Sequence, residues 1–310
     1  MWSRARGGLA TAGVLAAALL TAACHATATP AAAAAVGSSA AAYSAPSGPV
    51  VALGDSYTAG ALLPVNPLAK PSGCLRSEKA YPVLVAHALG APLKEAACAS
   101  AGVKNMTQAQ QTYLLKAYLG TNPAQLTALA PDDRLVLLTL SGDDMGFLNV
   151  LQECVKLSFT RPWGSPCEAN YTKDGTDQLA AGVTAEAPKM AQVLAEIAAR
   201  APRARIVVVG YPDLFPQSGG CWPKVPITSG DVTYLRGVEV KINAMLAATA
   251  GAAGATFVNT YTPTTGHDFC QPESVRDVEG LLPGSLAFPF HPNARGQAAM
   301  AAAVLAAVKG

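Results

Sequence analysis

The sequence predicts a single α/β domain with helices on both faces of a parallel sheet, and three observations support this fold class. Short apolar runs alternate with longer helical patterns, which is typical of strands joined by crossover helices. The runs LVLLTL (135–140) and IVVVG (206–210) are apolar without alternation, so both of their faces must be covered. No internal repeat and no shift in composition marks a second domain. We therefore expect a three-layer α/β/α sandwich.

The predicted elements follow one another from the first apolar run to the end of the chain. The predicted strands cover residues 50–53, 91–96, 135–140, 206–209 and 256–258. The predicted helices are one that follows Ser77 and continues to residue 89, a short one that opens at 122–123, and longer ones over 177–200, 231–250 and 293–308. Pro82 suits a first helical turn, and Asn293 suits the N-cap of the last helix.

Composition and charge exclude several classes of protein. The 310 residues are 51% hydrophobic and 14% charged, which provides a large core and argues against disorder. A formal net charge of +2 gives no strong field for holding nucleic acid. No second apolar run is long enough to span a bilayer, which excludes a polytopic membrane protein.

The N-terminus has the pattern of an export signal. Arg4 and Arg6 precede an apolar run of small residues over 9–23, as in a secretory signal peptide. A retained membrane anchor is the alternative, but the run is shorter than the ~20 residues that a spanning helix needs. We expect residues 1–23 to be the signal peptide and the protein to be secreted.

Cys24 is predicted to carry a lipid. The stretch LTAAC (20–24) resembles a bacterial lipobox, although Thr21 stands where leucine is usual. Seven cysteines in an exported chain leave one unpaired, and lipidation of Cys24 leaves an even set. Lipidation would anchor the protein on the outer face of the cell membrane, and ordinary cleavage near the alanines is the alternative. Residues 24–48 then form an Ala/Thr/Ser/Pro-rich tether, and 49–310 form the domain.

Ser56 is the candidate nucleophile. It lies just past the first predicted strand, at the carboxyl edge where parallel sheets carry their sites. Thr58 stands where the G-x-S-x-G elbow would need glycine, so this is not that motif. A turn whose serine merely caps a helix is the alternative. Catalysis by Ser56 requires an imidazole within hydrogen-bond reach of its hydroxyl.

Four histidines are available as the base. His291 is the first choice because it stands in a loop immediately before the last helix. His25 lies in the tether, and His87 is predicted to pack within an apolar helix. His267 either lines the acyl or alcohol site or packs its own loop.

Four blocks together resemble the GDSL or SGNH hydrolase superfamily, in its secreted actinobacterial esterase and lipase branch. The blocks are VVALGDSYTAG (50–60), ACASAGVKN (97–105), LTLSGDDMGF (138–147) and FHPNARGQAAMA (290–301). The resemblance covers nearly the whole domain. It implies a five-stranded parallel sheet of the flavodoxin type, which agrees with the strands predicted above.

The resemblance also implies roles for individual residues. Ser56 would attack an acyl ester, His291 would be its base, and the oxyanion hole would use the N–H groups of Ser56 and Gly102. A side chain at Asp143 would complete the hole, where the family has asparagine. Because an ionised carboxylate cannot donate a hydrogen bond, three outcomes are open: Asp143 is protonated, it turns away, or activity is largely lost. We expect a weakened but working hydrolase that is most active at mildly acidic pH.

The group that orients His291 also departs from the family pattern. Much of the superfamily has an aspartate three residues before the histidine, where this chain has Phe288. We predict a Ser-His dyad whose imidazole is oriented by the main-chain carbonyl of Phe288. Asp268 and Glu273 are the alternatives.

The six cysteines of the domain allow many pairings, and the resemblance implies sequential ones. These are Cys74 with Cys98, Cys154 with Cys167, and Cys221 with Cys270. Because the bridged loops lie on the catalytic edge, the disulfides should stabilise the site as well as the fold. No pair has C-x-x-C spacing, and we expect no metal and no cofactor.

The expected substrate is a carboxylic ester of lipid type. The apolar segments 61–65 and 147–150 would receive the acyl chain, and we expect a monomer without a nucleic-acid partner. Deacylation of a carbohydrate and acyl transfer to an alcohol are the alternative reactions. A surface binding protein that has lost activity is the alternative of a different class.

Overall fold

The computed structural model describes residues 48–114 and 116–309. The predicted signal peptide, the lipidation site Cys24 and nearly all of the tether lie outside these residues and stay predictions.

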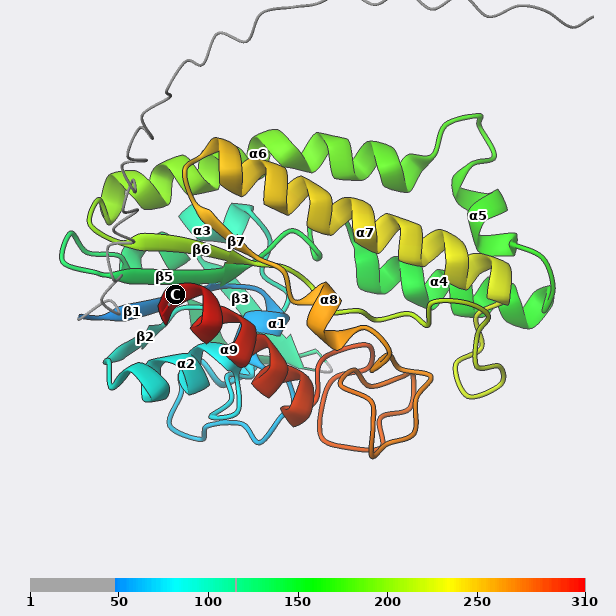
Figure 1. Cartoon of the computed structure of the whole chain (residues 1–310), viewed down its shortest axis with the longest axis horizontal. Coiled ribbons are helices and arrows are strands. Elements are labelled where there is room, and N and C mark those ends of the chain that lie inside the picture. The colour runs from blue at the N-terminus through cyan, green and yellow to red at the C-terminus, as the bar shows by residue number, and fades with distance from the viewer. Residues whose placement is uncertain (1–47, 115, 310) are drawn as a thin grey trace, which may run out of the picture. The chain divides into compact units, whose positions relative to one another are not determined.

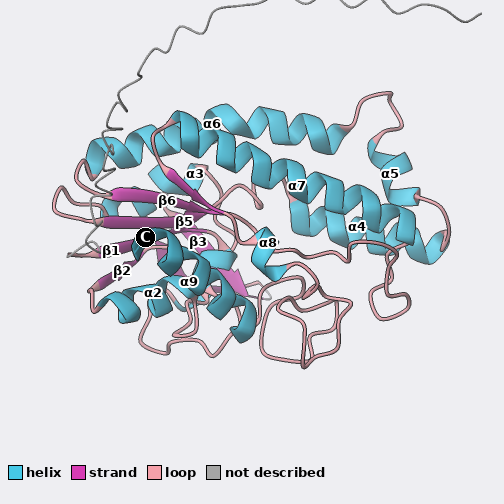
Figure 2. Cartoon of the chain, in the orientation of Figure 1, coloured by secondary structure: helices cyan, strands magenta, loops and turns pink. Residues whose placement is uncertain are grey.

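The centre of the domain is a parallel sheet, drawn in magenta in Figure 2. Its strands are β1 (Val50–Gly54), β2 (Leu93–Glu95), β5 (Leu135–Thr139), β6 (Arg205–Val209) and β7 (Thr256–Val258). All neighbouring pairs are parallel, in the order β2-β1-β5-β6-β7. This is the flavodoxin-like order, which brings sites to the carboxyl ends of the strands where the order reverses. Here that point lies between β1 and β5.

Helices cover both faces of the sheet, as Figure 1 shows: α6 and α7 lie on one side, and α2 and α9 lie on the other. The longer helices are α2 (Tyr81–Leu89), α4 (Phe147–Thr160), α6 (Gln178–Arg200), α7 (Ser229–Ala252) and α9 (Ala294–Lys309). The shorter ones are α1 (Ser56–Ala59), α3 (Lys104–Thr107), α5 (Pro166–Tyr171), α8 (Tyr261–Thr264) and the 3-10 turns η1 (Ser72–Cys74) and η2 (Gln125–Ala128). The Asp177 side chain caps α6, and Asn293 accepts bonds from the first amides of α9, as its predicted N-cap role requires.

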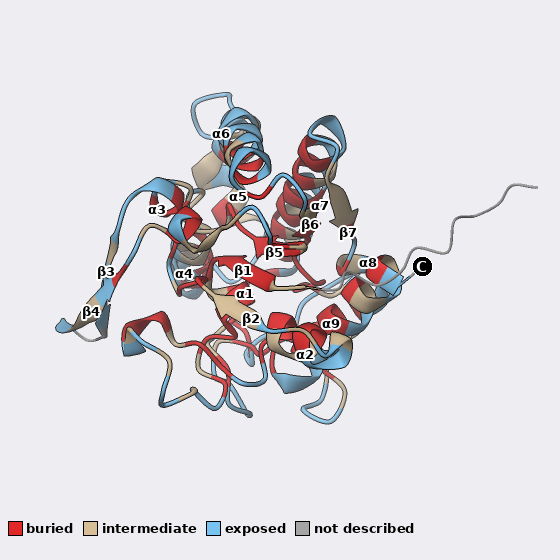
Figure 3. Ribbon diagram, turned by 90° about the vertical axis from the view of Figure 1, so that its left-hand side faces the viewer, coloured by how far each residue is buried: buried red, intermediate tan, exposed pale blue. Residues whose placement is uncertain are grey.

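The apolar runs are strands because both of their faces are covered. Every residue of β1 and β5 is buried, as the red strands in Figure 3 show. Val51 and Val136 belong to the core cluster beneath α6 and α7, whereas Val50 and Leu135 belong to the cluster beneath α2 and α9. The predicted three-layer sandwich with a five-stranded parallel sheet is therefore confirmed.

The structure adds elements that the sequence analysis did not assign. The strands β3 (Gln110–Leu114) and β4 (Ala117–Asn122) form an antiparallel hairpin beside the main sheet. Helices α4 and α5 occupy the segment after the third sequence block.

The predicted disulfide pairing is confirmed for all six cysteines of the domain. The bonds join Cys74 to Cys98, Cys154 to Cys167, and Cys221 to Cys270. None of the described helices is long and apolar enough to cross a membrane.

Candidate active site

Ser56 is presented by a tight turn at the end of β1. Gly54 has φ +122°, and an added Cβ would lie 2.1 Å from the Thr139 carbonyl oxygen, so only glycine fits there. The Gln125 side chain fixes this glycine by accepting its N–H at 2.7 Å and donating to its carbonyl at 2.9 Å. Asp55 caps α1 by accepting the Tyr57 N–H at 2.9 Å. The strand end therefore sets the position of Ser56.

Ser56 and His291 lie within hydrogen-bond distance, although 235 positions separate them in sequence. The Ser56 Oγ lies 2.7 Å from His291 Nε2. The opposite ring nitrogen, Nδ1, lies 2.8 Å from the Pro289 carbonyl oxygen. A carbonyl only accepts, so Nδ1 carries the proton and Nε2 is free to accept the serine proton. This is the tautomer that a general base requires.

The prediction that the Phe288 carbonyl orients the imidazole is wrong, because Pro289 does so instead. Phe290 has a left-handed backbone, with φ 61°, and the chain turns sharply there. The Phe288 carbonyl accepts the His291 main-chain N–H at 3.1 Å, while the ring reaches back to Pro289. The Phe288 ring packs edge-on against the imidazole, with centroids 5.3 Å apart.

His291 is held as a neutral base. Burial lowers its pKa to about 4, against the opposing effect of the bond to Pro289. The Tyr57 ring lies 4.6 Å from the imidazole between centroids, and its hydroxyl donates to the Phe290 carbonyl at 2.7 Å. The residue after the nucleophile thus holds the histidine loop in place.

The histidine loop is also held from its other side by Glu279. The Glu279 N–H donates to the His291 carbonyl at 2.9 Å. The Glu279 carboxylate accepts bonds from two nitrogens of Arg276, the Gly284 N–H, the Ser285 hydroxyl and the Asn293 amide. Burial opposes its ionisation, but these donors, with Arg276 foremost, outweigh it and lower the pKa of Glu279 to about 2.

A chain of hydrogen bonds ties the end of β5 to the nucleophile turn. The Gly142 N–H donates to the Tyr211 hydroxyl at 2.8 Å, and that hydroxyl donates to Asp55 at 2.6 Å. Burial, and then the neighbouring Asp143, raise the pKa of Asp55. Sequence reasoning missed Tyr211, since nothing near it in the chain marks it as part of the site.

Asp143 lies in the pocket beside Ser56. In the described part of the chain its carboxyl makes no hydrogen bond, whereas both oxygens of Asp144 accept the Val103 N–H. Burial, and then Asp144, raise the pKa of Asp143 to about 6.

The structure does not bring Gly102 to the pocket. Its N–H donates to the Asn105 side chain at 3.0 Å, and a Cβ there would lie 2.6 Å from an Asp144 oxygen, which explains the glycine. The pocket is lined instead by Ser100, which has the left-handed φ of 61° that glycine usually takes. The N–H groups of Ser100 and Ser56 have no partner among the described residues.

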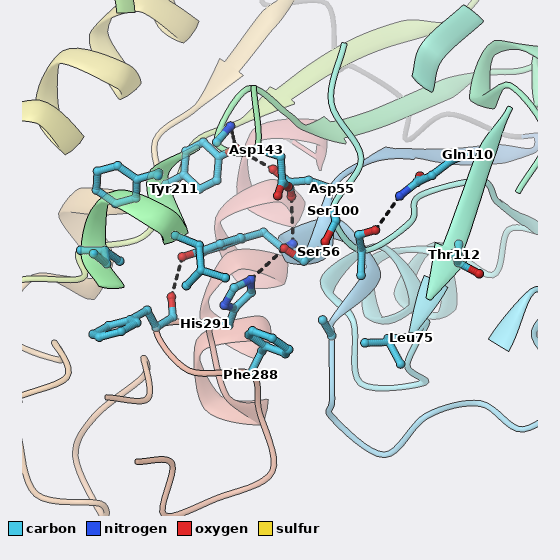
Figure 4. A pocket seen from close by; sticks show the side chains of 18 of the residues that line it. Asp55, Ser56, Leu75, Ser100, Gln110, Thr112, Asp143, Tyr211, Phe288 and His291 are labelled. Carbon is cyan, nitrogen blue, oxygen red and sulfur yellow. Dashed lines mark hydrogen bonds between the residues drawn. The ribbon is translucent and has the colours of Figure 1, made fainter. Parts of the chain in front are cut away.

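The pocket has a volume of about 380 Å³, and Ser56 and His291 lie between its two ends. Figure 4 shows Tyr211 on one side of the pair and Gln110 and Thr112 on the other. We call the end between α4 and α7 the inner arm; it is lined by Phe147, Leu148, Leu151, Leu214, Glu239 and Ile242. The other end is the outer arm, formed by η1, its C-cap residue and the hairpin; it is lined by Gly73, Leu75, Gln110, Gln111, Thr112 and Tyr113.

The other described histidines and carboxylates considered from the sequence do not line the pocket. His87 is exposed on the last turn of α2, so its predicted packing role is wrong. His267 binds the Val275 carbonyl through Nδ1 at 2.7 Å, which is the loop-packing alternative. Asp268 accepts the Cys270 N–H at 2.8 Å, and neither it nor Glu273 hydrogen-bonds His291 in the described chain.

Comparisons with known proteins identify the family and the fold. The sequence profile of the GDSL-like lipase/acylhydrolase family matches residues 52–299. The chain is 36% identical to Lipase 2 of Streptomyces coelicolor, over 84% of this chain and 85% of that protein. The crystal structure of phospholipase A1 from Streptomyces albidoflavus NA297 matches with a TM-score of 0.67 and 26% identity, over 86% of this chain and all of that one. The extracellular lipase from Streptomyces rimosus also has a TM-score of 0.67 and 26% identity, over 84% of this chain and all of that one.

Proposed function

Since the chain belongs to the GDSL-like lipase/acylhydrolase family and is a carboxylic ester hydrolase, we propose that Ser56 is its nucleophile and His291 its general base. The observation that carries the proposal is the 2.7 Å contact between Ser56 Oγ and His291 Nε2 inside a largely apolar pocket. The buried and neutral imidazole presents a lone pair to the serine hydroxyl.

The reaction proceeds through an acyl-enzyme. Ser56 Oγ attacks the ester carbonyl carbon while His291 Nε2 takes the serine proton. When the tetrahedral intermediate collapses, the imidazolium returns that proton to the leaving alcohol. Water then attacks the acyl-enzyme by the same steps and releases the carboxylic acid.

The oxyanion is stabilised by main-chain donors. The proposed donors are the N–H groups of Ser56 and Ser100, which line the pocket and have no partner in the described chain. Ser100 thus takes the role that the resemblance gave to Gly102. Asp143 adds a third donor only in its protonated form, because an ionised carboxylate would repel the oxyanion.

The inner arm holds the acyl chain, and the outer arm holds the alcohol. Leu151 and Leu214 are each 1% exposed, so the inner arm ends inside the core. Tyr113 of the outer arm is 56% exposed, so that end opens to solvent. The alcohol must leave while the acyl group is still bonded to Ser56, which places the alcohol on the open side. An acyl chain in a mainly apolar arm indicates a lipid-type ester.

The test is hydrolysis of p-nitrophenyl esters of increasing acyl length by wild type, Ser56→Ala and His291→Ala. We expect His291→Ala to lower kcat by about 100- to 10,000-fold, because proton transfer from the serine is lost. Ser56→Ala should leave no acyl-enzyme. Unchanged turnover in either folded variant would overturn the proposal.

The proposed function also includes export of the protein and its attachment to the membrane. The disulfides are consistent with secretion, since such bonds persist in oxidising compartments. We propose in addition a monomer tethered to the outer face of the membrane through lipidated Cys24. Wild type should then partition with membranes and Cys24→Ala should appear in the medium; equal release of both would contradict the tether.

A further inference from the structure

Tyr211 joins the carboxyl ends of three neighbouring strands through one buried hydroxyl. It follows β6, and its hydroxyl accepts the Gly142 N–H, after β5, at 2.8 Å and donates to Asp55, after β1, at 2.6 Å. Asn243 of α7 fixes the backbone of Tyr211 by accepting its N–H at 2.8 Å and donating to its carbonyl at 3.0 Å. Tyr211 is 6% exposed, so the hydroxyl is held in place on all sides.

The direction of these hydrogen bonds makes Asp55 an acceptor at both of its oxygens. An amide N–H only donates, so the Tyr211 hydroxyl accepts from Gly142 and gives its own proton to Asp55. The other oxygen of Asp55 accepts the Tyr57 N–H at 2.9 Å. Burial opposes the ionisation of Asp55, but every hydrogen bond that it makes within the described chain comes from a donor and favours the ionised form.

Asp143 is close to Asp55 but lacks such donors. Figure 4 shows Asp143 next to Asp55 and Tyr211, and the charges of the two carboxyls act on each other. The Asp143 carboxyl lines the pocket and makes no hydrogen bond in the part of the chain that the structure describes. Two carboxylates in one buried place repel each other, so one of them keeps a proton. The donors around Asp55 favour a proton on Asp143.

Building on the proposed function, we propose that Tyr211 is a positioning residue of the oxyanion hole: its hydroxyl keeps Asp55 ionised, and the charge of Asp55 keeps a proton on Asp143 beside Ser56. The same hydroxyl holds Gly142, the residue before Asp143, and so fixes the backbone from which the carboxyl reaches the pocket. A neutral carboxyl can donate to the oxyanion, as an asparagine amide would.

The other ionisable groups near the two carboxyls do not oppose this arrangement. Asp144 adds a negative charge that also favours a proton on Asp143. Burial favours the neutral form of the remaining side chains, which are Tyr57, Tyr81, Tyr211, Glu239 and His291.

The test is kcat against pH for wild type and Tyr211→Phe, each also in the Asp143→Asn background. Without the hydroxyl, Asp55 retains its proton, and its missing charge no longer holds a proton on Asp143. The alkaline decline of kcat should therefore move to lower pH by about one unit in Tyr211→Phe. In the Asp143→Asn background the amide donates at every pH, so Tyr211→Phe should not move the profile. Asp55→Asn, which removes the charge directly, should shift the profile in the same direction as Tyr211→Phe.

Tyr81→Phe is the matched control. The Tyr81 hydroxyl is also buried and lies 3.3 Å from the Thr58 hydroxyl and 3.2 Å from the Thr139 hydroxyl, but Tyr81 does not line the pocket. Its loss should lower the melting temperature and leave the pH profile in place.

The inference is overturned by an unmoved profile in folded Tyr211→Phe or folded Asp55→Asn, or by an equal shift in the Asp143→Asn background. A wild-type profile without an alkaline decline overturns it even if these variants do not fold. Labelling of Ser56 by a fluorophosphonate keeps the two proposals separate. Labelled wild type with any of these results loses only the role of Tyr211, whereas unlabelled wild type loses the proposed function.

Discussion

The charge on Asp143 sets the conditions under which the oxyanion hole has its side-chain donor. The pKa of Asp143 is about 6, so its carboxyl loses its proton, and can no longer donate a hydrogen bond, as pH rises through that value. His291, with a pKa of about 4, loses its base form as pH falls through that value. Both groups are in the required form only between these two values, which is the mildly acidic window expected from the sequence.

We therefore predict that wild-type turnover peaks between about pH 4 and about pH 6, and that Asp143→Asn removes the decline on the alkaline side. The amide donates at every pH, and one oxyanion donor is worth on the order of 100- to 1,000-fold in kcat. The measurement is kcat against pH for both proteins. A variant slower than wild type over the whole range would show that the carboxylate has another role.

Ser100 gives a second prediction for a single residue. A non-glycine residue in the left-handed region costs about 1–2 kcal/mol, and the extra entropy that glycine loses on folding offsets about 0.5–1 kcal/mol of this, so Ser100→Gly should stabilise the protein by about 1 kcal/mol or less. Because the proposed donor is the main-chain N–H, Ser100→Gly and Ser100→Ala should both retain kcat. Thermal unfolding and ester kinetics check this, and a large fall in kcat for Ser100→Ala would assign the donor to the hydroxyl instead.

Both corrections at the active site share a physical cause. The resemblance assigned the oxyanion donor to Gly102, but the left-handed residue at the pocket is Ser100. Likewise, the carbonyl that meets the imidazole depends on the left-handed turn at Phe290. Neither backbone angle can be read from residue type when a non-glycine residue adopts it.

At the scale of elements, the histidine loop depends on the ion pair of Glu279 with Arg276. Both side chains are almost fully buried. We predict that Glu279→Ala destabilises the protein by about 3–5 kcal/mol, because it leaves the guanidinium buried without its partner. Since the folded-state pKa of Glu279 lies near 2, below its unfolded value, its stabilising effect should be complete above the unfolded pKa and disappear as pH falls towards 2.

The control for this prediction is Glu153→Ala, which removes the exposed ion pair with Lys156 on α4. An exposed pair contributes little, so the free energy of unfolding should change by about 1 kcal/mol or less. Equal effects of the two substitutions, measured by denaturant unfolding, would contradict the role given to the buried pair.

The sheet could be predicted from the sequence, and some of the elements around the pocket could not. Strands β5 and β6 could be predicted because their residues are apolar without alternation. This pattern is typical of strands that are covered on both faces. The hairpin was missed because QQTYL and AYLGTN show neither clear alternation nor a strong turn signal. Helix α4 could have been found, since Phe147, Val150, Leu151 and Cys154 recur at helical spacing.

At the scale of the whole molecule, two of the disulfides join segments that frame the pocket to neighbouring segments. The bond between Cys74 and Cys98 joins η1, beside the outer arm, to the segment that carries Ser100. The bond between Cys154 and Cys167 joins α4, a wall of the inner arm, to α5. Closing such loops reduces the conformations available to the unfolded chain and to the loops themselves.

We predict that reduction lowers ester hydrolysis before, or together with, global stability. The measurement follows kcat and circular dichroism in parallel as a reductant is titrated, with the thiols then blocked. An untreated sample carried through the blocking step is the control. Full activity with all six thiols blocked would show that the bridges do not support the site.

The most direct test of the central claim is the identity of the residue that reacts with a fluorophosphonate probe. The Ser56–His291 contact predicts a single adduct on Ser56, found by peptide mass spectrometry of the folded protein. Labelling should be absent in Ser56→Ala and strongly slowed in His291→Ala, because the imidazole takes the serine proton. Folded wild type that remains unlabelled, or that carries the adduct on another residue while Ser56→Ala still hydrolyses esters, would contradict the assignment of Ser56 and His291.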